Sequence, residues 1–408
     1  MAYPTLMLVV PGAINTAFAL LLLLSLGILA SGWHQGSGGG AAADARRASL
    51  PATWGWGFSL AMLALPVSIF LSQVANQRWG WPYYDAASRF LFSVPIFFAL
   101  RRISPKCLRP LQYGLIGGAF VAAFAITYMP RDWGNGRLGT SFVNPIHFGD
   151  LALTLGALAA FSMDWAGRDA MWLQGLKACA LVAGLYASMK TGARGGWAAI
   201  PLFVALWLWF QRKSLPPSRL AWYAAAACVL AIASYLLLPE VHHRIDMIEA
   251  NLAAYQSGQD NTSLGIRFQL WRAALLIFEQ HPWLGVGMGG FKALMPAMQK
   301  AGVLTPLAAA FGEGEVHSEM LSRLCQLGIL GLIAIVSVYA LPALMFARRP
   351  FRGAAFRIQS AQMGMVLIGL FFVYGLSVET FDLTMTAAFY ALTTAILLAS
   401  TYNQNDSR

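Results

Sequence analysis

Apolar stretches long enough to cross a lipid bilayer limit how this chain can fold. A transmembrane helix needs about 20 mostly apolar residues, and runs of this kind recur along the sequence. Only 11% of the 408 residues are charged and 58% are hydrophobic, whereas a soluble domain is about 25% charged. The chain is therefore predicted to be an all-α, polytopic membrane helical bundle. A soluble enzyme, a disordered protein and a disulfide scaffold are excluded.

The expected spans follow the apolar runs. They cover residues 5–31, 52–73, 86–100, 111–129, 147–163, 171–189, 195–210, 220–238, 324–347, 358–378 and 384–401. The first run contains Pro11 and Gly12, so it forms either one tilted helix or two short passes. Two passes would give about 12 transmembrane helices. Residues 1–408 are expected to form a single integral membrane domain.

The connections between the spans fall into two alternating sets that differ in charge. The set with 101–110, 211–220 and 347–357 is rich in Lys and Arg. Short basic loops stay in the cytoplasm, so this set is predicted to be cytoplasmic. The net charge of +11 therefore indicates membrane topology and not nucleic-acid binding. The connection 239–323 then lies on the opposite side.

The connection 239–323 is much longer than the others, and such loops usually carry function. The sequence has no GxxxxGK[ST], HExxH or GxSxG motif. An enzyme acting outside the cytoplasm has no ATP or nucleotide sugar, so it would use a preactivated substrate or an ion gradient. The four cysteines are scattered, and we interpret them as small core residues, not as a disulfide or metal site.

The segment MKTGARGGWAAI (189–200) places Lys190 and Arg194 at the outer ends of two consecutive spans. Its glycines allow a tight turn and a close backbone approach. An arginine beside such glycines suits a phosphate oxyanion, because guanidinium and backbone N–H groups both donate. The alternative is a short turn with snorkelling charges.

The segment 260–283 has apolar residues at helical spacing and is predicted to be an amphipathic helix. Asn261, Thr262 or Ser263 could cap it, which would place Arg267 in the first turn. A cation there is unfavourable by itself, and a bound anion would reverse the sign. The alternative is a solvated arginine. The following HPWLGVGMGGF is interpreted as a glycine turn that ends this helix.

The segment FGEGEVHSEMLSRLCQLG (311–328) places His317 at the outer start of a span, close to Glu313, Glu315 and Glu319. An imidazole with carboxylate neighbours can act as a general base near neutral pH. A metal site is less favoured, because on a helix His317 would point away from the face that Glu315 and Glu319 share. A structural histidine is the other alternative.

The polar, glycine-rich segment GNGRLGTSFVNPIHFGD (134–150) contains Arg137 and Asn144. It is either a substrate-binding loop or a turn before a span. Asp150 at its end would be the first candidate for a proton-coupled function, because ionisable residues at membrane depth are usually functional.

Together these segments resemble the O-antigen ligase and O-antigen polymerase superfamily of bacterial envelope enzymes. TGARGG is similar to the family's T-x-S-R-G-x segment, with Ala193 where Ser is common. VHSEMLSRLCQLG resembles its H-N-x-x-L segment, with Ser318 where Asn is common. GIRFQLW followed by HPWLGVGMGGF, and RLGTSFVNPIHFG further upstream, are similar to two other family segments.

The resemblance implies a glycosyltransferase-C-like helical bundle of the bacterial inner membrane, with a large helical periplasmic loop over 239–323. The enzyme would transfer O-antigen polysaccharide from undecaprenyl pyrophosphate to a sugar hydroxyl of lipid A–core. It would need no metal, nucleotide or other cofactor. Membrane lipids would surround it, and the active site would face the periplasm.

The resemblance also implies roles for particular residues. Arg194 and Arg267 would stabilise the charge on the leaving pyrophosphate. His317 would orient or deprotonate the acceptor hydroxyl, and direct attack would invert the anomeric centre. Further substrate contacts would come from Lys190, Arg137, Asn144 and Glu315.

Two groups of alternatives remain open. The same motifs occur in a polymerase, which joins repeat units, and in a protein O-oligosaccharyltransferase, which uses a protein acceptor. A secondary transporter or lipid flippase would also be polytopic with basic cytoplasmic loops. Its signature would be broken helices in two matching halves with charges inside the membrane, and the sequence shows no matching halves.

Overall fold

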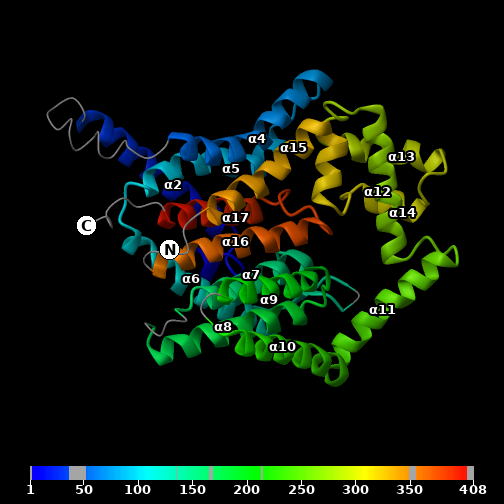
Figure 1. Ribbon diagram of the computed structural model, residues 1–408. Coiled ribbons are helices and arrows are strands. Elements are labelled where there is room, and N and C mark those ends of the chain that lie inside the picture. The colour runs from blue at the N-terminus through cyan, green and yellow to red at the C-terminus, as the bar shows by residue number, and fades with distance from the viewer. Residues whose placement is uncertain are drawn as a thin grey trace.

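The chain is almost entirely helical in its computed structural model, which describes residues 2–35, 52–134, 136–164, 169–212, 215–348 and 355–401. Figure 1 shows long helices packed side by side, with a group of shorter helices beyond one end of the bundle. The one short ribbon in these ranges pairs β1 (Arg131–Asp132) with β2 (Leu138–Gly139) in antiparallel register. The prediction of a helical membrane protein agrees with this architecture.

The helices follow one another along the bundle and then along its end. The elements are α1 (Tyr3–Leu6), α2 (Ala13–Gln35), α4 (Ala52–Asn76), η1 (Trp81–Tyr83), α5 (Tyr84–Leu100), η2 (Pro105–Leu108), α6 (Leu111–Tyr128), α7 (Pro145–Phe161), α8 (Met171–Lys190), η3 (Gly195–Ala198), α9 (Ala199–Gln211), α10 (Pro217–Leu237), α11 (Pro239–Gln256), α12 (Ser263–Gln280), α13 (Gly290–Lys300), α14 (Pro306–Gly312), α15 (Glu319–Ala347), α16 (Ala355–Gly375) and α17 (Thr384–Thr401).

The centre of the bundle is α17, which packs against α5 and α16. Aromatic rings join these helices: the ring of Phe381 lies 5.0 Å from those of both Phe90 and Tyr390. Edge-to-face pairs at such distances add to the stabilisation that comes from apolar burial. At the periphery, α10 has no buried residue at all, although its mean hydropathy is 1.9. Such a helix is suited to lipid and not to water.

The predicted count of about twelve spans is not confirmed. Within the described ranges, seven helices are long and apolar enough to cross a membrane: α2, α4, α6, α10, α15, α16 and α17. Two expected spans form the shorter apolar helices 145–161 and 195–211. The expected spans at 86–100 and 171–189 correspond to α5, which has 17 residues, and α8, which carries Lys177 and Lys190.

The first apolar run does not form two membrane passes. Residues 3–6 form a single turn of helix, and one long helix then begins at Ala13. Gly12 has a positive φ of 76° between them, a conformation that favours glycine. A four-residue helix is too short to span the hydrocarbon core.

Three of the four cysteines are not core residues. Cys107, Cys179 and Cys228 are exposed on the bundle, and only Cys325 is buried. The interpretation of all four as small core residues is therefore wrong. The apolar runs that contain Cys179 and Cys228 turn these side chains outward, and an apolar run alone does not show which face is buried.

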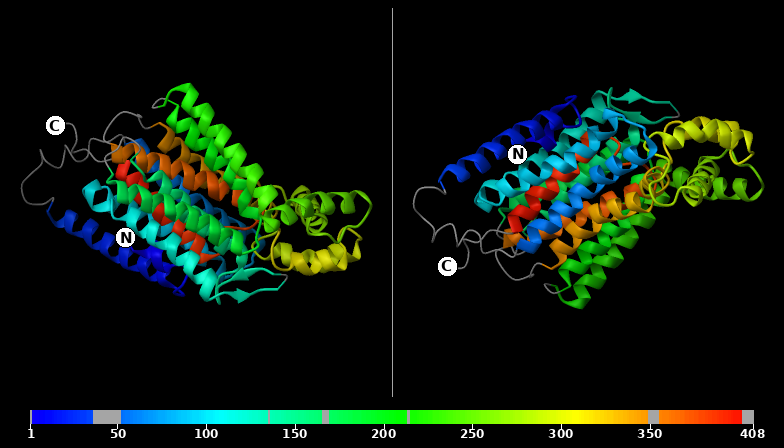
Figure 2. Two further views of the ribbon diagram at one scale, coloured as in Figure 1. Left: turned by 90° about the horizontal axis from the view of Figure 1, so that it is seen from below. Right: turned by 90° about the horizontal axis from the view of Figure 1, so that it is seen from above.

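Helices α12, α13 and α14 form a separate layer beyond one end of the bundle, which we call the cap. Figure 2 shows the cap projecting from the same end in both views. It has its own apolar core, in which Leu270, Ile277 and Met295 pack with Val316 and Cys325. The last two residues belong to the start of α15 and the segment before it, so the cap is anchored to the bundle there.

Two glycines allow the cap to approach α15 closely. Gly328 interrupts α15 with a φ of 68°, and the backbone N–H of Ile329 donates to the carbonyl of Pro282 at 2.8 Å. A Cβ on Gly328 would lie 2.3 Å from the carbonyl carbon of Trp283, and one on Gly285 would lie 2.3 Å from that of Gln326. Only glycine fits at such a crossing of two backbones.

Candidate active site

Four connections meet one another at the end of the bundle that carries the cap. The ribbon before α7 joins the turn after α8, because Leu138 N–H donates to Thr191 C=O at 3.0 Å. That turn reaches the α16–α17 connection, since a Cβ on Gly195 would lie 3.1 Å from Ser377 Oγ. The α16–α17 connection holds the segment before α15, because Val316 N–H donates to Glu379 Oε1 at 2.5 Å.

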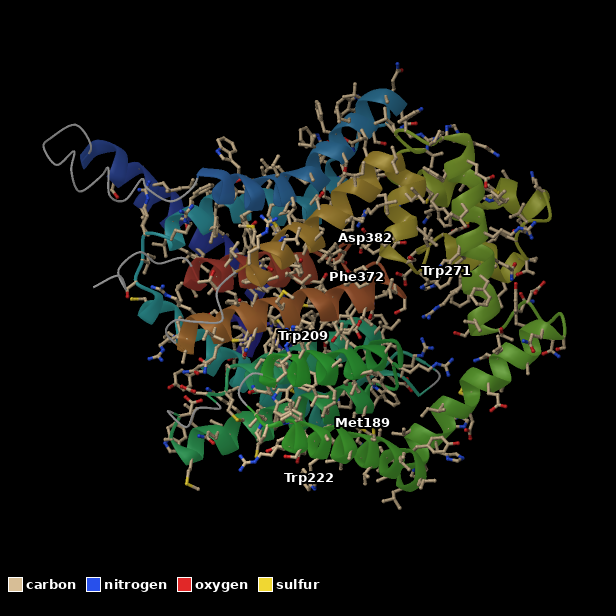
Figure 3. All side chains as sticks on the ribbon, in the orientation of Figure 1. Met189, Trp209, Trp222, Trp271, Phe372 and Asp382 are labelled. Carbon is tan, nitrogen blue, oxygen red and sulfur yellow. The ribbon has the colours of Figure 1, made fainter. Side chains whose placement is uncertain are left out.

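The side-chain view agrees with this arrangement. In Figure 3 Asp382 lies at the end of the bundle, and Trp271 lies across from it on α12. The indole N–H of Trp271 donates to the carbonyl of His317 at 3.3 Å. The cap therefore contacts the segment that carries the predicted base.

The turn after α8 has the tight geometry that its glycines predict. Gly192 has a φ of 67°, and Ala193 N–H donates to Thr191 Oγ1 at 3.1 Å. Arg194 follows in a half-buried position directly before η3. Lys190 ends α8 and is exposed, with its Nζ 5.9 Å from the ring centre of Tyr186.

Gly196 serves packing. A Cβ at this position would lie 2.1 Å from Asp150 Oδ1 and 3.5 Å from the Tyr374 ring. The glycine therefore lets the turn sit directly on α7 and α16. Asp150 itself is buried at this contact.

The predicted amphipathic helix is α12, and Thr262 is its cap. Thr262 Oγ1 accepts the Gly265 N–H at 3.0 Å. Arg267 lies in the second turn, not the first, because four helical residues precede it. Burial lowers the pKa of its guanidinium and the positive charge of Arg137 adds to this effect, whereas Glu315 opposes it. Arg267 is thus close enough to Glu315 and Arg137 for their charges to change its pKa.

The segment before α15 brings Glu315 and His317 together. Oε1 of Glu315 lies 3.0 Å from Nδ1 of His317, although the angle falls outside hydrogen-bond geometry. Such contacts in a free enzyme often align only when substrate binds. Glu315 and His317 do not share a helix with Glu319, as the comparison of helical faces assumed, because α15 begins at Glu319 and both residues precede it.

His317 has a strained backbone. Its φ is 61°, in the left-handed region that side chains other than glycine rarely adopt. Strain of this kind costs about 1–3 kcal/mol and persists where the surroundings impose it. Here Ser318 caps α15 through its Oγ, and Trp271 holds the His317 carbonyl.

The carboxylate of Glu315 is kept ionised by its partners. Burial alone would raise its pKa, but the imidazole of His317 and the backbone N–H of Glu379 outweigh burial and hold the pKa below its usual range. The Glu379 N–H donates to Glu315 Oε2 at 3.3 Å. The charge of Glu315 thus acts on both the imidazole of His317 and the guanidinium of Arg267.

A buried polar network supports this segment from below. Glu379 accepts from Val316 N–H and from Ser322 Oγ at 2.8 Å. Burial and the charge of Asp382 raise the pKa of Glu379 well above its usual range. Arg323 donates to Glu319 Oε1 at 2.8 Å and also pairs with Asp382.

None of Arg323, Glu379 and Asp382 was predicted from the sequence to be a site residue. The Glu319–Arg323 pair was recoverable, because opposite charges four residues apart on a helix are neighbours. The contact between Glu379 and Val316 joins positions 63 residues apart, and no local pattern indicates it.

The remaining predicted residues lie on the ribbon side of the site. Arg137 is exposed on the turn that connects β1 and β2. Asn144 caps α7, and its Oδ1 accepts the His147 N–H at 3.0 Å and lies 3.0 Å from His147 Nδ1. The amide oxygen of Asn144 is thus already engaged within the protein.

A cavity of about 260 Å³ lies next to these groups, between the cap and the starts of α5 and α15. Its wall includes Glu315, whereas Arg194, Arg267 and His317 are not among the described residues that line it. The other lining residues are Leu65, Ile69, Pro82, Tyr83, Ala86, Ala87, Met288, Gly289, Phe291, Lys292, Gly312, Glu313, Gly314, Val316, Arg323, Gln326, Glu379, Phe381 and Asp382. Glu315 therefore lines the cavity and also contacts His317.

The fold and site define a helical membrane protein with a cationic and imidazole-bearing site at one end. Comparison with known proteins carries this further: residues 179–336 match the family model described as O-antigen ligase. The matched segment contains Arg194, Arg267 and His317, and the match supports assignment of the chain to the O-antigen ligase family. This family implies a glycosyltransferase-like enzyme of the ligase or polymerase type.

The chain is also similar to an uncharacterized protein of Haemophilus influenzae. The two are 21% identical over 283 residues, which is 68% of this chain and 70% of the relative. The family's activity further implies a lipid-linked polysaccharide donor and a lipid-anchored acceptor in the membrane.

Proposed function

We propose that this protein is an O-antigen ligase of the bacterial inner membrane. It transfers O-antigen polysaccharide from undecaprenyl pyrophosphate to a sugar hydroxyl of lipid A–core. The reaction takes place at the periplasmic end of the bundle, where the cap lies. This orientation is supported by the basic connections at 101–110, 211–220 and 347–357, which belong to the opposite side.

The observation that carries the proposal is the position of the Glu315 carboxylate. It contacts His317, and its negative charge acts on the guanidinium of Arg267. A carboxylate at Nδ1 favours the tautomer with its proton on that nitrogen. Nε2 is then left with a lone pair that can accept a proton from an acceptor hydroxyl. The same carboxylate keeps a guanidinium nearby for the opposite task, the stabilisation of negative charge.

The donor supplies the driving force, because a pyrophosphate is a good leaving group. When the anomeric C–O bond breaks, negative charge develops on the carrier pyrophosphate, and preorganised donors at that point lower the barrier. Arg267 and Arg194 take this role, and Arg137 and Lys190 add positive charge at the outer edge. Direct attack of the acceptor oxygen on the anomeric carbon inverts that centre.

The test is a transfer assay with purified protein, undecaprenyl-pyrophosphate glycan and lipid A–core in EDTA. The expected product is lipid A–core that carries the glycan. Longer lipid-linked chains with unchanged lipid A–core would mean a polymerase. Transfer to neither acceptor would contradict both and point to a protein acceptor or to transport. Loss of activity in EDTA that one added metal restores would contradict metal independence.

A further inference from the structure

The cavity beside Glu315 has a lining that does not suit a pyrophosphate. Lys292 brings one positive charge, against the carboxylates of Glu313 and Glu315. Arg323 also lines the cavity, but Glu319 and Asp382 both pair with its guanidinium. The cationic charge is therefore compensated, and a multiply charged anion would meet net repulsion.

The same lining suits a neutral, hydroxyl-bearing ring. Carboxylates accept hydrogen bonds from hydroxyl groups, and ammonium and guanidinium groups donate to hydroxyl oxygens. Arg323 is 1% exposed, and its Nη1 has a thioether as its partner, Met288 Sδ at 3.8 Å. A thioether is a weak acceptor. This buried donor at the cavity wall therefore gains from a ligand oxygen.

Tyr83 supplies an aromatic surface at the rim of the cavity. Its ring is held between two glycines: a Cβ on Gly80 would lie 2.6 Å from the ring, and one on Gly289 would lie 2.5 Å from Tyr83 Oη. An aromatic side chain combines a large apolar face with few rotatable bonds, which suits a binding platform. The face of a sugar ring, which carries C–H groups, is a suitable partner for it.

We infer that this cavity is the acceptor subsite and takes a single neutral sugar ring of the acceptor, while the donor pyrophosphate occupies the Arg194–Arg267 side of Glu315. The volume is below the roughly 300–1,000 Å³ of pockets that hold drug-sized ligands, which agrees with one ring and not a longer glycan. Glu315 lines the cavity, and its Oε1 is 3.0 Å from His317 Nδ1. The ring directs one hydroxyl past Glu315 to the Nε2 of His317, which takes its proton. This inference rests on the proposed glycosyl transfer.

The experiment measures the KM for each substrate separately in the transfer assay. Ala86→Leu reduces the cavity volume, and Tyr83→Ala removes the platform at a residue that is 36% exposed. The control is Ser88→Leu, which adds a similar side chain to α5 at a position that is not among the cavity-lining residues. Both test variants should raise the KM for the acceptor about tenfold, the lower end of the effect of a lost pocket contact. The KM for the donor should stay unchanged, and the control should match the unmodified protein.

Two results would overturn the subsite. Unchanged acceptor KM in both folded test variants would show that the acceptor does not use the cavity, and a raised donor KM would assign the cavity to the donor instead. If the unmodified protein transfers glycan to lipid A–core or to a second lipid-linked chain, the KM of that acceptor is the one measured. If it transfers to no sugar, the proposed function fails and the subsite fails with it. The two failures are therefore distinct.

Discussion

Glu315 Oε1 lies 3.0 Å from His317 Nδ1, in a segment that crosses from the cap to α15. This contact links the residue expected to move a proton with the charge that orients it. Because the charge of Glu315 also acts on Arg267, one side chain is coupled to the proposed base and to an arginine proposed to hold the donor.

We expect His317 to be essential for transfer as a base, and its strained backbone to lower the stability of the fold. His317→Ala should lower kcat about 10²–10⁴-fold, as expected for loss of a general base. His317→Gly should be equally inactive, but it should unfold at a higher temperature than His317→Ala, since glycine relieves the strain of a positive φ. Activity retained in His317→Ala would rule out the base. Equal thermal stability of the two variants would contradict the strain.

Arg267 and Arg194 should matter through their position and not through charge alone. Arg267→Ala and Arg194→Ala should each reduce transfer about 100-fold or more, the usual effect of removing a donor that stabilises developing charge. Arg272→Ala is the matched control, because it removes an exposed arginine from the same helix as Arg267. Membrane insertion and yield should be equal in all three. Similar activity of the Arg267 and Arg272 variants would contradict the assignment.

The pKa of Glu315 predicts how stability depends on pH. Because its pKa is lowered in the folded protein, the ionised carboxylate stabilises the fold above the unfolded pKa, and this contribution is lost as the pH falls through the folded value. The difference in unfolding temperature between the unmodified protein and Glu315→Gln should therefore be present at neutral pH. It should shrink on acidification. A difference in unfolding temperature that grows as the pH falls would contradict the lowered pKa of Glu315.

Only glycine should be tolerated at position 328, where α15 crosses the turn after α12. Gly328→Ala would place a Cβ 2.3 Å from backbone at a positive φ, so it should destabilise the protein by more than about 1 kcal/mol and separate the cap from the bundle. Gly175→Ala is the control, because the space around it is open and it lies in α8. Thermal unfolding and protease sensitivity of the cap measure both. Normal cap protection in Gly328→Ala would contradict the close crossing.

The sequence allowed the helical class and the place of several site residues to be predicted, because these depend on local patterns. The glycine turn at Gly192 and the capped helix that carries Arg267 follow from spacing and capping residues. The number of membrane spans could not be predicted in this way. Helix α5 has only 17 residues and α8 contains two lysines, so neither is identified as a span by its own length and composition. The buried residues that support the site could not be predicted either. Glu379 reaches Val316 only after the bundle has assembled, and Arg323 is surrounded by an apolar run that gives it no visible partner except Glu319.

The need for Arg267 in glycan transfer is tested most directly by following both products of the reaction at once with purified protein. Glycan-bearing lipid A–core and free undecaprenyl pyrophosphate should appear in equal amounts with the unmodified protein and with Arg272→Ala. Neither should form at a comparable rate with Arg267→Ala. Release of undecaprenyl pyrophosphate without glycan on lipid A–core, or full transfer by Arg267→Ala, would contradict the account.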